Sequence, residues 1–262
     1  MKITIVADIS SRISQKNYNA DRITAAAVCL PSGELNNIRK LLHSDLPKWR
    51  DASDSEVRLV SDIVVREALG IGVFSIGKSD EKWDQFWEDG ESANSDLLGK
   101  ASAVKAAFQI KCQMFVTSTS YAFISAVNAE NILGSSNRPY KIATNETLIF
   151  DKEIDGDYNI DVFNGIWRRM NERKQDTELH GVRRNIDEVL FTTEQEDRLL
   201  MLPDYVAGIA QAALSQANVL ARSQVTAQCV QSVQQRLKQA PHYILKSEQF
   251  SLTHSDIFGA LF

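Results

Sequence analysis

Three aspartates stand where carboxylates could bind a metal ion. Asp8 directly follows residues 2–7, which are rich in β-branched types, and Asp151 directly follows the apolar residues 147–150. Each segment is typical of a buried strand, and open α/β sheets build their sites at the carboxyl ends of their strands. Asp204 stands in the first turn of an expected helix. The three positions therefore predict a carboxylate site at one edge of a sheet.

The chemistry expected of Asp8, Asp151 and Asp204 is metal-dependent phosphodiester hydrolysis. Neighbouring carboxylates repel one another unless a cation neutralises them. Mg²⁺ and Mn²⁺ prefer oxygen ligands, and such ions can activate a water and stabilise a leaving oxygen. Each aspartate also has a structural alternative. Asp8 could cap a loop, Asp151 could belong to a turn, and Asp204 could interact with the positive end of its helix.

Strand and helix patterns alternate along the chain, which predicts one α/β layered domain that spans residues 1–240. The middle segment, residues 31–140, is rich in helical patterns and is expected to be a helical insertion. The expected strands are residues 2–7, 23–30, 73–76, 147–150 and 186–191. The expected helices are residues 33–43, 54–69 with Asp54 as N-cap, a short one within 79–94, 96–127 in one or two pieces, 161–173 and 203–221.

The last expected helix has a small-residue face. From Ala207 to Ala221, alanine or leucine recurs at spacings of three and four, and Gly208 lies one turn after Asp204. Such a face lets a helix approach a sheet closely. The packing would bring Asp204 toward the strand ends that carry the other two aspartates, although it could also be only a tightly packed helix.

Three blocks around the aspartates resemble an uncharacterised bacterial ribonuclease H-like family. They are residues 5–8, 148–151 and 200–208. The family opens with a strand followed by Asp-Glu-Ser-Gly and carries a late helix with the pattern Leu-Gln-x-Ala-Asp-x-x-Ala-Gly. The resemblance implies a mixed sheet flanked by helices. It also implies that Asp8, Asp151 and Asp204 match the metal-binding carboxylates of the family.

The chain departs from that family pattern at several positions, so it resembles a divergent member, either active or inactive. Ile9 and Ser11 stand where the family has Glu and Gly, and Met201 and Pro203 replace Gln and Ala. The resemblance also implies a fourth carboxylate from a helix, for which Glu56 and Glu67 are the two candidates.

A basic segment could bind a phosphate backbone. Residues 166–185 include Arg168, Arg169, Arg173 and Lys174, and phosphate neutralisation supplies most of the affinity for nucleic acid. The alternative is an ordinary solvated helix face. The net charge of −5 argues against a protein whose whole surface binds nucleic acid.

A competing motif lies at residues 72–79, where Gly72, Gly77, Lys78 and Ser79 match the phosphate-binding loop pattern G-x-x-x-x-G-K-[ST]. A nucleotide-binding protein is therefore an alternative. The context argues against it, because a helix rather than a strand is expected before Gly72. The residues between the two glycines are also strand-like, whereas a phosphate needs an open loop.

The sequence lacks the motifs that are typical of disulfide-rich, zinc-binding and serine hydrolase proteins. The three cysteines are far apart and form no C-x-x-C pair, the histidines show no zinc-ligand spacing, and no G-x-S-x-G occurs. Cys29 and Cys112 are expected to be buried apolar residues. No signal peptide or membrane span is expected, which favours a cytoplasmic location. The tail, residues 241–262, could pair with a protein partner or a second copy, or fold back on its own core.

Overall fold

The computed structural model describes residues 2–10, 22–78, 83–92, 104–128, 143–152, 154, 156–175 and 183–214. The strands are β1 (Lys2–Ile9), β2 (Arg22–Pro31), β3 (Gly70–Gly77), β4 (Ala143–Asp151) and β5 (Arg183–Thr192). The helices are α1 (Leu35–Leu41), α2 (Asp54–Glu67), α3 (Trp83–Ser92), α5 (Val104–Asn128), α6 (Asp157–Gln175) and α7 (Met201–Leu214). Three 3-10 helices join them: η1 (Ser32–Glu34), η2 (Trp49–Asp51) and η3 (Arg198–Leu200).

The strands form one five-stranded sheet in the order β3-β2-β1-β4-β5. β1 pairs antiparallel with β2, and β2 pairs antiparallel with β3, whereas β1–β4 and β4–β5 are parallel. An antiparallel half joined to a parallel half in this order is the ribonuclease H-like topology. The predicted fold class, an α/β mixed sheet flanked by helices, is therefore confirmed.

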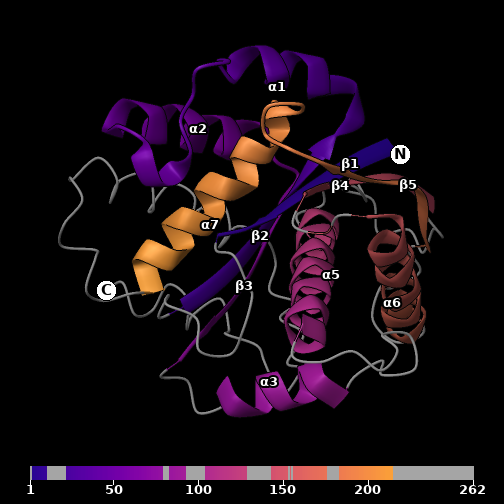
Figure 1. Ribbon diagram of the computed structural model, residues 1–262. Coiled ribbons are helices and arrows are strands. Elements are labelled where there is room, and N and C mark those ends of the chain that lie inside the picture. Colours follow the sequence, from indigo (N-terminus) through magenta and orange to yellow (C-terminus); the bar gives the residue numbers. More distant parts are fainter. Residues whose placement is uncertain are drawn as a thin grey trace.

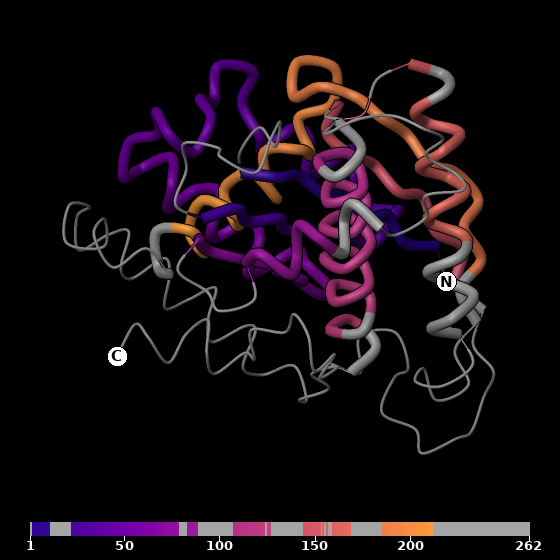
Figure 2. Tube along the Cα trace, turned by 60° about the horizontal axis from the view of Figure 1, so that its bottom comes forward, coloured from indigo at the N-terminus to yellow at the C-terminus, as the bar shows by residue number. Residues whose placement is uncertain are grey.

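Helices cover both faces of the sheet (Figure 1). Side chains alternate across a strand, so β1 contributes to both layers. Ile3, Ile5 and Ala7 pack in the core beneath α5 and α6, and Val6 packs in the core beneath α1, α2 and α7. The trace in Figure 2 shows the violet α1 and α2 on the side of the sheet away from the magenta α5 and salmon α6. Asp8 shares the alternation of Val6 and therefore faces the α7 layer.

The segment expected to be a helical insertion, residues 31–140, contributes directly to the sheet and to both layers. It supplies the edge strand β3 and the helix α5, which lies across β3 and β2. Within the described residues α5 is one continuous helix from Val104 to Asn128. None of the helices that the structure describes is both long enough and apolar enough to span a bilayer. Cys29 and Cys112 are buried, as predicted.

α2 begins with a capping box, and its N-cap is Ser53 rather than the expected Asp54. The Ser53 hydroxyl accepts a hydrogen bond from the Glu56 amide, and the Glu56 carboxylate accepts one from the Ser53 amide. Hydrogen bonds from the Ser53 side chain and amide lower the pKa of Glu56. Ser53 stands three residues before Glu56, which is the spacing of a capping box, and Asp54 takes the first helical position, where an acidic residue is favourable.

We expect Ser53→Ala to lower the free energy of unfolding by about 1 kcal/mol at pH 7, because the hydrogen bonds of the Ser53 hydroxyl with the Glu56 amide and carboxylate are lost. The lowered pKa of Glu56 means that its contribution is present above its ordinary value of 4.5 and is lost as the pH falls through the folded value. Urea unfolding at several pH values measures both effects. A loss that does not shrink in acid would contradict the role of ionised Glu56.

Candidate metal centre

Asp8 and Asp151 meet at the carboxyl ends of two neighbouring parallel strands. Ala7 of β1 pairs with Phe150 of β4, and each aspartate follows one residue later. Phe150 packs beneath α5 and Ile149 beneath α7, so alternation turns Asp151 toward the α7 layer, as it does Asp8. The strand register therefore brings two carboxylates to one point on one face, as the sequence predicted.

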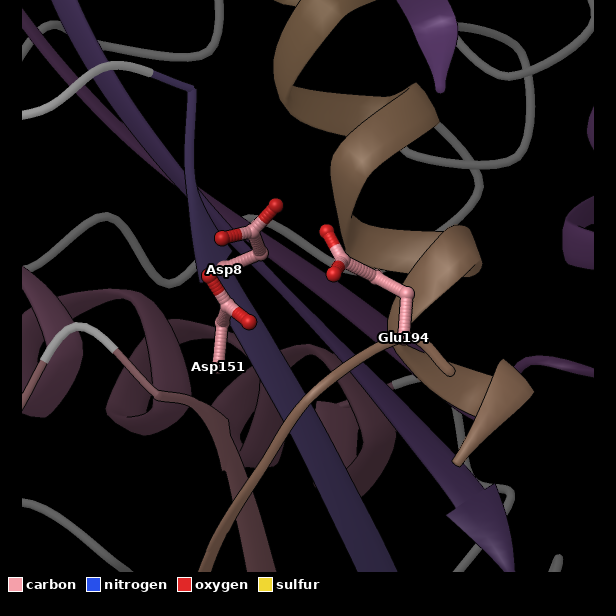
Figure 3. A group of neighbouring side chains, drawn as sticks. All are labelled: Asp8, Asp151 and Glu194. Carbon is pink, nitrogen blue, oxygen red and sulfur yellow. The ribbon is translucent and has the colours of Figure 1, made fainter. Parts of the chain in front are cut away.

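Glu194 is the third member of the cluster, and the sequence reasoning missed it. β5 pairs in parallel with β4, with Thr192 opposite Asp151, and the chain then turns toward η3 through Glu194. Asp8, Asp151 and Glu194 each offer a carboxylate oxygen, and these oxygens lie within 4.8 Å of one another. Figure 3 shows the three side chains directed toward a common point. The only sequence signal was an acidic residue shortly after an expected strand.

Asp204 lies beside this cluster, in the first turn of α7. Its Oδ2 accepts a hydrogen bond of 2.8 Å from the backbone amide of Trp49. The charge of Asp204 is close enough to Asp8 to raise the pKa of that aspartate. α7 packs on β1 and β2, which agrees with the close approach expected from its small-residue face. A direct role of Asp204 as a metal ligand stays a prediction.

The two candidates for a helical fourth carboxylate are engaged elsewhere on α2. Glu56 belongs to the capping box with Ser53, and the Oε1 of Glu67 accepts a hydrogen bond of 2.6 Å from Arg66. Among the residues that the structure describes, the acidic group able to share a metal is Asp8, Asp151 and Glu194, and α2 contributes none of it.

Burial makes the negative charge of the cluster unfavourable without a cation. Asp8 is only 3% exposed. Burial raises the pKa of Asp8 well above 3.8, the charges of Asp151 and Asp204 raise it further, and a 2.6 Å hydrogen bond from the Ile9 amide opposes the rise. Burial also raises the pKa of Asp204, against the Trp49 hydrogen bond. A bound divalent cation would stabilise the ionised forms of both groups.

A lysine already contacts the cluster. Lys48 forms an ion pair with Glu194, whose side chain is buried whereas that of Lys48 is 49% exposed. Burial lowers the pKa of Lys48, but the hydrogen bond and charge of Glu194, with the charges of Asp8 and Asp151, outweigh it and leave that pKa raised. Lys48 is therefore a cation held against the carboxylates, and the sequence pattern did not single it out.

The loop that carries Lys48, residues 43–50, is fastened to η3 and α7. The Arg198 Nη2 donates hydrogen bonds of 2.8 Å to the carbonyl oxygens of His43 and Leu46. The Tyr205 hydroxyl donates one of 2.8 Å to the carbonyl oxygen of Pro47. These contacts fix the loop over the end of the sheet that carries the carboxylates.

The indole of Trp49 adds an apolar contact between the loop of residues 43–50 and α7. It packs against Gly208, where a Cβ atom would overlap the indole ring. Trp49 also makes an edge-to-face contact with Tyr205, with ring centroids 6.0 Å apart. The glycine one turn after Asp204 therefore serves the loop that carries Lys48, in addition to the close packing of α7.

The expected basic patch lies on the other helix layer. Arg168 is an exposed residue of α6, and α6 packs on the face of the sheet opposite α7. Arg169, Arg173 and Lys174 are also within α6, but their side chains lie outside the described residues. The binding of nucleic acid by these four residues stays a prediction. The charges of Lys48 and Arg50, which lie outside α6, lower the pKa of Asp204 against the larger effect of burial.

The competing phosphate-loop motif forms a strand through Gly77. Gly72 and Gly77 belong to β3 and pair with Ala27 and Arg22 of β2. An extended strand does not wrap an anion as a phosphate loop does. Gly72 instead allows close packing, since a Cβ there would overlap the backbone of α5. Lys78 follows β3 directly, and Ser79 lies outside the described residues.

The donor atoms of the cluster fit a hard divalent cation. Asp8, Asp151 and Glu194 offer only carboxylate oxygens, the ligand type that suits Mg²⁺ and Mn²⁺. Asp8 and Glu194 are buried, and Asp151 is half-buried. The arrangement can therefore hold a divalent ion at the end of β1 and β4. Comparison of the sequence with known protein families and with curated proteins gave no match.

Proposed function

We propose that this protein is a metal-dependent phosphodiester hydrolase of the ribonuclease H-like type, acting on nucleic acid. The observation that carries the proposal is the convergence of Asp8, Asp151 and Glu194 within 4.8 Å at the carboxyl ends of adjacent strands. Three carboxylates at one point repel one another, and a divalent cation, which prefers oxygen ligands, would neutralise them. The cofactor proposed is Mg²⁺ or Mn²⁺.

In this proposal each acidic residue has a defined task. Asp8, Asp151 and Glu194 would hold the ion, which would activate a water and stabilise the leaving oxygen. The 2.6 Å hydrogen bond from the Ile9 amide orients the Asp8 carboxylate. The bond from the Trp49 amide orients Asp204 beside the cluster, where it could act as a further ligand. Arg168, Arg169, Arg173 and Lys174 of α6 would contact more distant phosphates.

The same proposal includes the family to which the chain would belong. The three aspartate blocks resemble an uncharacterised bacterial ribonuclease H-like family, and the sheet order agrees with that fold. The departures at Ile9, Met201 and Pro203 make this chain a divergent member. Glu194 would then stand in for a carboxylate that the family pattern takes from a helix.

A second candidate function is a catalytically silent ribonuclease H-like subunit that binds a partner. One observation favours it: Lys48 already forms an ion pair with Glu194 and could neutralise the cluster without a metal. The tail, residues 241–262, is the surface expected to bind such a partner or a second copy, and it lies outside the described residues.

The deciding experiment compares the wild type with Asp151→Asn. Calorimetry with Mn²⁺ and cleavage of single- and double-stranded DNA, RNA and hybrid are expected to show binding and cleavage by the wild type. The variant should lose both because one ligand charge is gone. Asp62→Asn, an exposed substitution on α2, is the matched control and should keep both. A wild type that neither binds Mn²⁺ nor cleaves any substrate would favour the silent subunit.

A further inference from the structure

We propose that the Lys48 ammonium is the resident cation of the carboxylate cluster and leaves Glu194 when a divalent ion binds. Lys48 thereby sets the metal affinity of the site. The inference rests on the proposed function, since it takes the cluster to be a metal site. Lys48 acts on the metal site through Glu194. It forms an ion pair with this carboxylate in the metal-free protein and releases it when the metal ion is bound.

The first argument is the unequal exposure of the two partners. The Glu194 side chain is 7% exposed and that of Lys48 is 49% exposed. The carboxylate therefore depends on a nearby cation, whereas the ammonium sits at the end of a flexible four-carbon stem that already reaches solvent. Rotation of that stem moves the charge away from Glu194 with little loss of packing.

The second argument is that the backbone around Lys48 is held on both sides. The carbonyl oxygen of Pro47 accepts a bond from the Tyr205 hydroxyl, and the amide of Trp49 donates one to Asp204, each at 2.8 Å. The exchange therefore needs no movement of the loop over residues 43–50. The ammonium alone changes place and stays at the rim of the site, where it could meet a substrate phosphate.

The third argument is charge balance. Asp8, Asp151 and Glu194 place up to three negative charges within 4.8 Å, and Asp204 adds another beside them. One ammonium offsets only part of this charge, and a divalent ion offsets more of it at shorter range. Glu194 is the ligand for which the two cations compete, because it is the carboxylate that Lys48 touches.

The test compares Mn²⁺ binding by calorimetry in the full-length wild type, Lys48→Met and the matched control Lys40→Met, an exposed lysine of α1. Lys48→Met should bind Mn²⁺ more tightly by roughly 5- to 100-fold, the range typical of coupled binding. Lys40→Met should match the wild type. Binding by Lys48→Met alone would also support the exchange and would explain a silent wild type.

Two outcomes overturn the inference, and they differ in what they say of the proposed function. Equal or weaker Mn²⁺ binding by Lys48→Met, beside clear binding by the wild type, removes the exchange but leaves the metal site. No Mn²⁺ binding by either protein removes both.

A second measurement uses the wild type and so does not depend on the folding of a variant. Amine acylation followed by mass spectrometry should show faster modification of Lys48 when Mn²⁺ is present, because its ammonium has left Glu194. Lys40 should react at the same rate with and without Mn²⁺. In Asp151→Asn the metal dependence at Lys48 should disappear. A Lys48 rate that Mn²⁺ leaves unchanged, at concentrations where calorimetry shows binding, contradicts the exchange.

Discussion

Asp8→Asn is expected to abolish Mn²⁺ binding while making the metal-free protein more stable at neutral pH. The asparagine Oδ1 can still accept the 2.6 Å hydrogen bond from the Ile9 amide, but the buried charge beside Asp151 is gone. Removing a carboxylate that burial and its acidic neighbours disfavour should raise the free energy of unfolding by about 1 to 3 kcal/mol. Cleavage should fall by at least about 10³-fold, equivalent to ~4 kcal/mol of activation free energy.

The increase in the free energy of unfolding of Asp8→Asn depends on pH, and its direction follows from the raised pKa of Asp8. The pKa of Asp8 is raised, chiefly by burial, above its ordinary value of 3.8. Its contribution to stability is therefore complete below that value and is lost as the pH rises through the folded value. The difference between Asp8→Asn and the wild type should be small in acid and should grow with pH. Saturating Mn²⁺ should reduce it by stabilising only the wild type.

Urea unfolding across this pH range, with and without Mn²⁺, measures the whole pattern, and calorimetry measures the binding. Asp62→Asn provides the control, because that exposed residue of α2 lies away from the cluster. If Asp8→Asn were less stable than the wild type at high pH, or bound Mn²⁺ as tightly, Asp8 could not be a metal ligand whose buried charge destabilises the metal-free protein.

Gly72→Ala is expected to destabilise the protein by about 3 kcal/mol or more, the upper end of the cost of overpacking. A Cβ at Gly72 would overlap the carbonyl oxygen of Ser118 and the amide nitrogen of Ala122, both backbone atoms of α5. Backbone atoms of a packed helix cannot rotate away as a flexible side chain can. α5 would have to withdraw from β3 and β2, which it covers.

Gly33→Ala is the matched control, since a Cβ there meets nothing within 4 Å. Its free energy of unfolding should stay within about 0.5 kcal/mol of the wild type. Chemical unfolding of both variants gives the comparison. Equal stability of the two would refute the close approach of α5. Loss of nucleotide binding without loss of stability in Gly72→Ala would instead restore the phosphate-loop interpretation of Gly72, Gly77, Lys78 and Ser79.

The sequence by itself determined the parts that depend on local pattern. The runs of β-branched and other apolar residues predicted β1 and β4, and the residue directly after each run, Asp8 or Asp151, had to fall at a strand end. The helical spacing of small residues predicted α7 and placed Asp204 in its first turn. These features follow from the composition of short apolar runs and from the 3.6-residue repeat of helices, both of which a single sequence displays.

Glu194 and Lys48 became visible only in the tertiary structure. Glu194 belongs to the site because β5 pairs with β4 in a register that sets Thr192 opposite Asp151. Lys48 belongs to it because Arg198 and Tyr205 fasten residues 43–50 across the end of the sheet. Strand register and loop docking bring together residues that are far apart in the sequence, such as Lys48 and Glu194. Packing and hydrogen bonds between distant segments decide the strand register and the position of the loop. The spacing of residues within a short segment does not show either of them.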